Sequence, residues 1–181
     1  STETYTEYFG PENHAFFIGK DLVIMLDNII HGVDNKHKYT EGYSDEQLDW
    51  VEALLKLIPK NADIYVGQHS PTNGRSYLRD ESEAYLITNG SEFLSLFGDR
   101  NVHLISGHNH INMNFQYAPN IVEHNVAAIC GTWWDAYHCK DGTPRGYKVY
   151  TKKDGLLTWY YKSVGKDKDF QYEVFLPGET K

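Results

Sequence analysis

The stretch VHLISGHNH, residues 102–110, is a short apolar run that ends in a glycine and two histidines. The apolar residues predict a strand, and the glycine with the two imidazoles predicts a turn at the end of that strand. Neutral imidazole is the commonest protein ligand of transition metals. The spacing of His108 and His110 therefore predicts that this turn carries metal ligands.

A second strand-like run, residues 62–68, ends at a further histidine, His69. A helix is predicted between this run and residues 102–106. Strand, helix and strand in this order form a β-α-β unit, whose two strands run parallel. Parallel strands end at the same edge of a sheet, which is where ligand sites in open α/β sheets gather. We therefore expect His69, His108 and His110 to meet at one edge of the sheet and to bind metal.

The other predicted elements place this unit in an α/β fold that becomes strand-rich after residue 110. One helix begins at Ser44, because Ser44 and Gln47 form a capping-box pattern and apolar residues then recur at helical spacing up to Pro59. Asp154-Gly155 predicts a tight hairpin turn. The remaining predictions are strands at 14–18, 22–26, 112–117, 121–128, 147–151 and 156–161, a helix from Ser91 to Gly98, and an edge strand or the start of another module at 170–176.

Composition excludes some classes of protein. The 181 residues suffice for one domain, or for one domain and part of a second. The net charge is −8, and no block of Lys and Arg provides the basic surface that nucleic-acid binding needs. Phosphorylated substrates stay possible, because divalent metals supply local positive charge. No apolar run approaches the roughly 20 residues of a membrane span.

Cys130 and Cys139 could form a bridge in a protein exported to the periplasm or cell surface, or remain thiols in the cytosol.

Five segments between residues 10 and 110 occur in a distinctive order. They are Gly10-Pro11 before an aromatic strand, residues 22–28, residues 44–51, His69-Ser70-Pro71, and Gly107-His108-Asn109-His110. This order is similar to that of the C-terminal half of a calcineurin-like metallophosphoesterase, in the superfamily of the purple acid phosphatases and the Ser/Thr protein phosphatases. Residues 130–134 and 141–147 resemble a bacterial branch of that superfamily with an added C-terminal module.

The resemblance implies part of a two-sheet β-sandwich flanked by helices. It also implies two divalent metal ions (Mn, Fe or Zn), one bound by His69 and His108 and the other by His110. The parent enzyme would hydrolyse phosphate mono- or diesters through a two-metal-activated hydroxide in an in-line displacement. Trp133 and Trp134 are candidates for the substrate-binding cleft, although packing in the core or against another domain is an alternative for both. No residue of this chain is assigned as a catalytic acid or base.

The sequence also departs from the family pattern. The superfamily's Asp-x-His, Gly-Asp-x-x-Asp and Gly-Asn-His-Asp signatures, which supply its other ligands, do not occur in these residues. We therefore expect residues 1–163 to be the C-terminal portion of the phosphoesterase domain, and residues 164–181 to be a linker or the start of a β module. The isolated chain is then expected to be inactive, to bind metal weakly or not at all, and to need the N-terminal half of the same protein as a partner. Exposed apolar edges would also allow a homo-oligomer.

Two alternatives remain at this point. Three histidines and a water form a catalytic zinc geometry by themselves, so the chain could be a self-contained trihistidine zinc hydrolase, which would bind one zinc ion tightly. It could also be a non-catalytic β-rich binding module with surface aromatic residues. Such a module would keep its ligand binding after His69, His108 and His110 are all changed to Ala.

Overall fold

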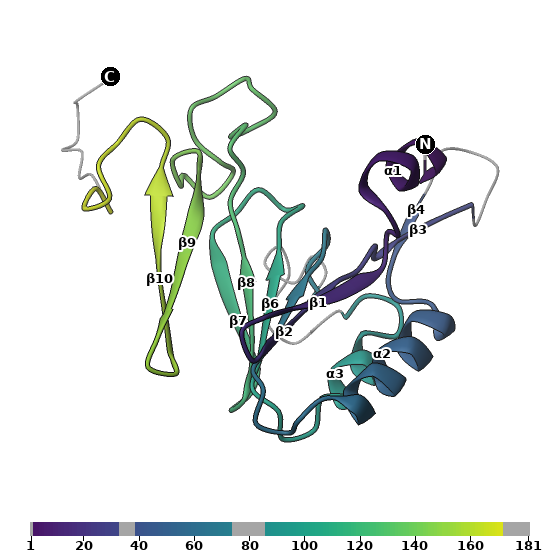
Figure 1. Cartoon of the computed structure of the whole chain (residues 1–181). Helices are drawn as coiled ribbons and strands as arrows, with labels where there is room; N and C mark the ends of the chain where they lie inside the picture. The colour runs from purple at the N-terminus through teal and green to yellow at the C-terminus, as the bar shows by residue number, and fades with distance from the viewer. Residues whose placement is uncertain (1, 33–38, 74–85, 172–181) are drawn as a thin grey trace, which may run out of the picture. The chain divides into compact units, whose positions relative to one another are not determined.

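The computed structural model describes residues 2–32, 39–73 and 86–171 (Figure 1). The chain divides into two compact units. The first unit comprises Ser1–Asn109 and Met113–Asn125, and the second comprises His110–Asn112 and Val126–Lys181. This division falls at a different place from the predicted boundary between residues 163 and 164, which stays a prediction.

A six-stranded mixed sheet is the centre of the first unit. Its strands are β1 (His14–Ile18), β2 (Asp21–Met25), β5 (Ile64–Gly67), β6 (Val102–Ser106), β7 (Met113–Ala118) and β8 (Ile121–Asn125). They lie in the order β1-β2-β5-β6-β8-β7. The four inner strands β2, β5, β6 and β8 run parallel, and the two edge strands β1 and β7 run antiparallel to their neighbours. The carboxyl ends of the four inner strands therefore share one edge of the sheet.

Two helices, α2 (Asp45–Leu57) and α3 (Gly90–Ser95), lie against one face of this sheet (Figure 1). The core forms where the apolar sides of the helices meet alternate residues of the inner strands, because successive strand residues point to opposite faces. One buried row runs across the sheet through Ile24, Val66 and Leu104, which are paired in register. The side chains from the helices include Val51, Leu55 and Phe93.

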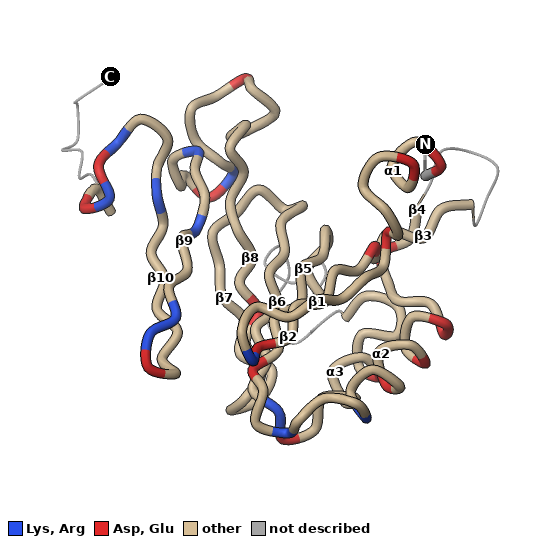
Figure 2. Tube along the Cα trace, viewed as in Figure 1, with Lys and Arg blue, Asp and Glu red and all other residues tan. Residues whose placement is uncertain are grey.

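Helix α2 begins and ends as its sequence predicts. Ser44 Oγ accepts a hydrogen bond from the Gln47 amide at 3.2 Å, and Gln47 Oε1 accepts one from the Ser44 amide at 2.9 Å. This is the reciprocal capping box. The acidic residues of α2, which are red in Figure 2, are all exposed. At the other end, the Arg100 guanidinium donates to the carbonyl oxygens of Leu55, Ile58 and Pro59 at 2.8–3.0 Å. Arg100 thus satisfies carbonyl groups that a helix end leaves without partners.

Three short elements of the first unit were not predicted. They are α1 (Thr2–Phe9), β3 (Ile29–His31) and β4 (Tyr39–Glu41). β3 and β4 form a separate antiparallel pair. Their three-residue length gives too little alternation for a pattern in the sequence.

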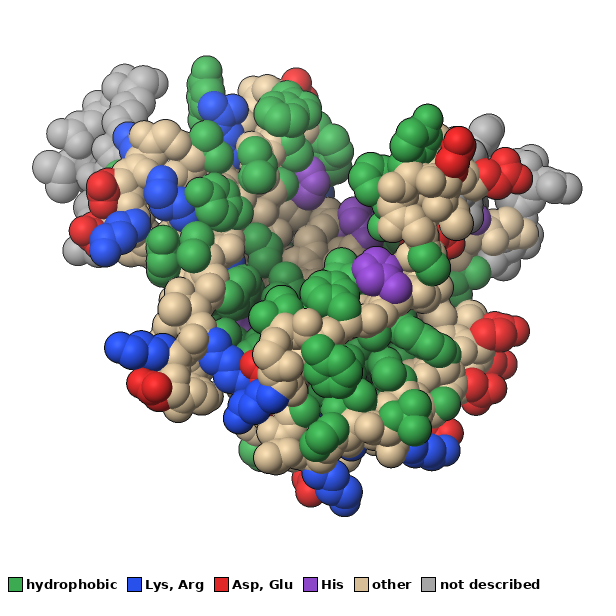
Figure 3. Space-filling view, in the orientation of Figure 1, with side chains coloured by type: hydrophobic (Ala, Val, Ile, Leu, Met, Phe, Trp, Pro, Cys, Tyr) green, Lys and Arg blue, Asp and Glu red, His purple; other side chains and the backbone are tan. Residues whose placement is uncertain are grey.

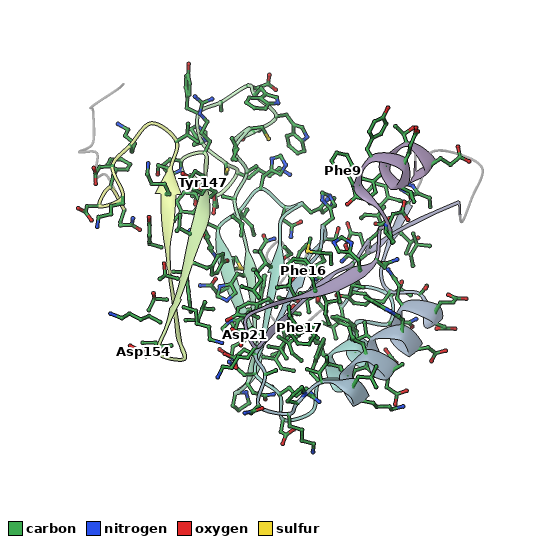
Figure 4. All side chains as sticks on the ribbon, in the orientation of Figure 1. Phe9, Phe16, Phe17, Asp21, Tyr147 and Asp154 are labelled. Carbon is green, nitrogen blue, oxygen red and sulfur yellow. The ribbon has the colours of Figure 1, made fainter. Side chains whose placement is uncertain are left out.

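The second unit contains an antiparallel hairpin of β9 (Gly146–Lys153) and β10 (Leu156–Ser163). Asp154 and Gly155 form its turn with φ values of 51° and 83°, and Figure 4 shows Asp154 at the tip. Two successive positive φ values are what a type I′ hairpin turn needs, so the Asp-Gly signal is confirmed. Cys130 and Cys139 also belong to this unit, and both are free thiols.

Most predicted elements are confirmed, with small shifts at their ends. β8 stops at Asn125 rather than at residue 128, and α3 stops at Ser95 rather than at Gly98. The predicted strand at 170–176 is not formed at its first two residues, and the rest of it lies outside the described residues. The α/β class itself is confirmed. Within the described ranges, no helix is long and apolar enough to cross a membrane.

Candidate metal site

The structure brings His69 and His108 together at the carboxyl edge of the sheet. The Gly107 amide donates to the His69 carbonyl oxygen at 2.9 Å. This hydrogen bond extends the parallel pairing of β5 and β6 beyond the ends of both strands. This backbone bond places the two imidazoles next to each other, with His69 Nε2 and His108 Nδ1 separated by 2.9 Å. The predicted convergence is therefore observed for these two histidines.

His108 lies in a strained turn. Its φ of 63° is in the left-handed region, and the Asn109 amide donates to the Gly107 carbonyl oxygen at 2.7 Å, which closes a three-residue γ-turn around His108. The buried Asn125, at the end of β8, donates its side-chain N–H to the same carbonyl oxygen. A positive φ in a non-glycine residue costs of order 1–3 kcal/mol and persists where its surroundings enforce it. The two hydrogen bonds to Gly107 provide that enforcement.

The loop that carries His69 is held by Asn28, which follows β2 and is fully buried. Asn28 Oδ1 accepts hydrogen bonds from the amides of His69 at 3.2 Å and Ser70 at 3.0 Å. Its Nδ2 donates to the Ser70 carbonyl oxygen at 2.7 Å. One side chain thus satisfies three backbone groups at the point where β5 ends, and fixes the backbone from which the His69 ring projects.

A buried carboxylate holds the same loop from the other side. Glu123, in β8, accepts hydrogen bonds from the Thr72 amide at 3.0 and 3.1 Å and from Gln68 Nε2 at 3.2 Å. It also accepts a hydrogen bond of 2.5 Å from the Tyr117 hydroxyl. Burial raises the pKa of Glu123 above its ordinary value, although these donors act in the opposite direction. His69 therefore lies in a loop that buried polar groups anchor on both sides.

A further carboxylate contacts His108. Glu41 Oε1, at the end of β4, lies 2.9 Å from His108 Nε2, and the two side chains are 13% and 18% exposed. Both ring nitrogens of His108 are thus engaged, Nδ1 by His69 and Nε2 by Glu41. Nothing in the sequence around Glu41 indicated this contact, because β4 was not predicted.

His110 belongs to the second unit, and its contacts are with other residues of that unit. Its Nδ1 lies 2.8 Å from the Gly131 carbonyl oxygen, and its ring lies 4.8 Å from that of Trp133 between centroids. A metal-binding histidine typically donates one ring N–H to a carbonyl and presents the other nitrogen to the ion. The surroundings of His110 match that pattern with Nε2 as the ligand nitrogen. Its convergence with His69 and His108 stays a prediction.

Trp133 and Trp134 lie in the turn that follows Cys130. They are 57% and 73% exposed and have positive φ values of 47° and 70°. They are therefore not part of a core. The Lys140 ammonium lies 4.6 Å from the centre of the Trp133 ring. Their proposed place in a substrate cleft stays a prediction.

A cavity of about 430 Å³ opens beside His69 in the first unit. Its lining comes from the ends of β2 and β5 and from α1, and includes Asp27, Met25 and Tyr5. Among the residues that the structure describes, no group of three or more His, Cys, Asp or Glu side chains is arranged to enclose a metal ion. The first unit therefore offers two converging nitrogens beside an open space.

The sequence alone identifies the histidines but not the residues that hold them. Asn28 and Asn125 each lie at the carboxyl end of a parallel inner strand. Polar residues at these ends are candidates for a site, so the positions of both asparagines in the sequence could have predicted their role. Glu41 had no such signal. Its contact with His108 depends on a short strand and on the tertiary fold.

Comparison with known proteins finds a matching family and several similar solved structures, among them a phosphatase and a nucleotidase. The family described as the C terminal of calcineurin-like phosphoesterase matches residues 123–181. A dimetal phosphatase from Danio rerio is 15% identical with a TM-score of 0.53, over 70% of this chain and 56% of that protein. A 5′-nucleotidase from Candida albicans is 16% identical with a TM-score of 0.49, over 90% of this chain and 30% of that protein. No curated protein matches the sequence. The chain thus spans little more than half of the first structure and about a third of the second.

Proposed function

Since residues 123–181 match the C-terminal region of the calcineurin-like phosphoesterases, as the sequence predicted, we propose that this chain carries one side of a two-metal phosphoesterase site. The observation that carries the proposal is the pair of ring nitrogens, His69 Nε2 and His108 Nδ1, at the carboxyl edge of parallel strands. The parent protein would be a hydrolase of phosphate mono- or diesters. The assignment of the chain to a bacterial branch of the superfamily also stays a proposal.

The spacing of the two histidines suits a shared metal ion. Two nitrogens bound at about 2.0–2.1 Å to one tetrahedral zinc ion lie about 3.3 Å apart. The observed separation of 2.9 Å is close to that value, so a small outward movement of the rings would admit an ion. The γ-turn at His108 and the Asn28 contacts at His69 hold the backbone in place, so that movement would be confined to the side chains.

Each residue has a defined part in the proposal. His69 and His108 would hold one ion, and His110 the other through the nitrogen opposite its Gly131 contact. A pair of divalent ions (Mn, Fe or Zn) supplies Lewis acidity for in-line displacement at phosphorus. The cavity beside His69 gives space for a phosphorylated substrate.

The sequence does not contain the carboxylate and asparagine signatures that complete such a site in the superfamily. We propose that the N-terminal half of the same protein supplies them, so that the isolated chain binds metal weakly and has little or no phosphatase activity. The edge strand β1 suits such a partner, because Phe16, Phe17 and Ile18 are 45%, 53% and 65% exposed. Figure 4 shows both phenylalanines on this strand, and Figure 3 shows the hydrophobic surface over it. An exposed apolar edge is prone to pair with another chain.

The experiment is a calorimetric titration of the purified chain with zinc and manganese, together with an assay on an aryl phosphate. We expect weak zinc binding that is lost in His69→Ala/His108→Ala and kept in His14→Ala, which removes a histidine of β1. We also expect no turnover above the metal-only rate. Equal binding by the double variant would refute the metal site. Rapid metal-dependent turnover by the isolated chain would refute the need for a second half.

A size measurement tests the partner. Light scattering of the isolated chain is expected to show self-association that Phe16→Lys/Ile18→Lys reduces, because charge on an edge strand opposes strand pairing. A monomer at all concentrations would contradict the proposed role of β1.

A further inference from the structure

We propose that Glu41 is a positioning residue of the metal site, which fixes His108 so that its Nδ1 is the nitrogen that faces the ion. This inference rests on the proposed function of the His69–His108 pair, and it adds a carboxylate from outside the histidine motifs.

The two nitrogens of the His108 ring have different roles. In a neutral imidazole, one nitrogen donates and the other accepts. Glu41 Oε1 is 2.9 Å from His108 Nε2, so the carboxylate selects the tautomer with the proton on Nε2. The lone pair of His108 is then on Nδ1, which is the nitrogen 2.9 Å from His69 Nε2. The nitrogen that needs to be unprotonated for a metal therefore points at the other ligand.

Glu41 is not placed to coordinate the ion directly. The two nitrogens of an imidazole ring point in divergent directions, and Glu41 and His69 lie at different nitrogens of the same ring. An ion between His69 and His108 Nδ1 would therefore be on the side of the ring away from Glu41. A carboxylate that accepts from the outer nitrogen of a metal-binding histidine fixes the ring orientation and raises the basicity of the ligand.

The backbone holds Glu41 in place. The Glu41 carbonyl oxygen accepts from the Thr88 amide at 3.1 Å, and the next amide, that of Gly42, donates to the Asn28 carbonyl oxygen at 3.0 Å. A Cβ at Gly42 would lie 2.5 Å from Thr88 Cβ, so only glycine allows this approach. Asn28, which anchors the His69 loop, thus also anchors the strand that carries Glu41.

The surroundings of Glu41 and His108 strengthen their contact. Glu41 and His108 are mostly shielded from water, and such shielding strengthens a hydrogen bond to a carboxylate. The ring of Tyr39, two residues before Glu41 on the same side of β4, meets the His108 ring edge-on at 6.2 Å between centroids. β4 therefore restrains the imidazole both through a hydrogen bond and through an aromatic contact.

The test compares wild type, Glu41→Ala, Glu41→Gln and the control Asp49→Ala, which removes an exposed carboxylate of α2. The first readout uses no metal: long-range ¹H–¹⁵N NMR at a pH where His108 is neutral reports which ring nitrogen carries the proton. We expect the Nε2–H tautomer in wild type, a mixture in Glu41→Ala, and the wild-type signature in Glu41→Gln, whose amide oxygen still accepts from Nε2.

The second readout is the zinc dissociation constant. Loss of such a contact typically weakens metal binding 10–100-fold. We expect this loss in Glu41→Ala, partial recovery in Glu41→Gln and no change in Asp49→Ala. An unchanged tautomer in Glu41→Ala would overturn the inference. If wild type binds zinc, an equal zinc affinity of Glu41→Ala would also overturn it. A wild type that binds no zinc but shows the Glu41-dependent tautomer would refute metal binding by the His69–His108 pair in the isolated chain, while leaving the orientation of His108 by Glu41 established.

Discussion

Replacement of Asn28 by Ala tests how the histidine edge is built. Asn28 is fully buried and forms three hydrogen bonds with the backbone of His69 and Ser70. Each lost bond removes about 1 kcal/mol, and each buried group left without a partner costs about 1–3 kcal/mol. We expect Asn28→Ala to lower the free energy of unfolding by about 3–5 kcal/mol. For a unit of this size, that change lowers the Tm by about 10–20 °C.

The assay combines thermal unfolding by circular dichroism with amide hydrogen exchange by NMR. In wild type, the amides of His69 and Ser70 are protected by Asn28 Oδ1, so both should exchange faster in Asn28→Ala. Asn28→Asp keeps the acceptor oxygen and should keep both amides protected, although the Ser70 carbonyl oxygen loses one of its two donors and keeps Gln68 Nε2 at 3.1 Å. Asn61→Ala changes an exposed asparagine and should alter stability by no more than about 0.5 kcal/mol.

Two results would refute this reasoning. The first is a Tm for Asn28→Ala within about 2 °C of wild type, because three buried hydrogen bonds cannot then depend on this side chain. The second is unchanged protection of the His69 and Ser70 amides, which would mean that another group satisfies them.

Three further predictions concern the same unit. Gly42→Ala should displace the strand that carries Glu41, because the new methyl group would lie 2.5 Å from Thr88 Cβ, and NMR shifts of the His108 ring would report the movement. Arg100→Met should destabilise the chain by about 2–3 kcal/mol in urea unfolding, since three carbonyl oxygens lose a charged donor. Burial raises the pKa of Glu123, so its protonated form favours the folded state. That contribution is complete below the unfolded pKa of about 4.3 and is lost as the pH rises through the folded value. The free energy of unfolding of wild type should therefore fall relative to that of Glu123→Gln as the pH rises above about 4, and parallel profiles would contradict this.

The sequence was informative where local rules act alone. The capping box at Ser44 and the Asp154-Gly155 turn form as predicted, because each depends only on contacts within a few residues. The β-α-β order likewise predicted that β5 and β6 are parallel, since the connection between them leaves little choice of direction. From that topology, the meeting of His69 and His108 followed.

The sequence was less informative where an element is too short to show a period. β3 and β4 have three residues each, and their pairing depends on contacts with Asn28 and with the segment at Thr88. Residue patterns do not encode such contacts. The position of Glu41 against His108 therefore came only from the structure.

By itself, the sequence determined the identity of the candidate ligands and, for His69 and His108, the edge of the sheet at which they lie, because strand order and chain direction are properties of the connected chain. The tertiary structure decided how His108 is held. Whether an imidazole presents Nδ1 or Nε2 depends on which groups meet its two sides, and these groups, His69 and Glu41, are brought there from distant parts of the chain by the closure of the sheet and of β4 around one edge.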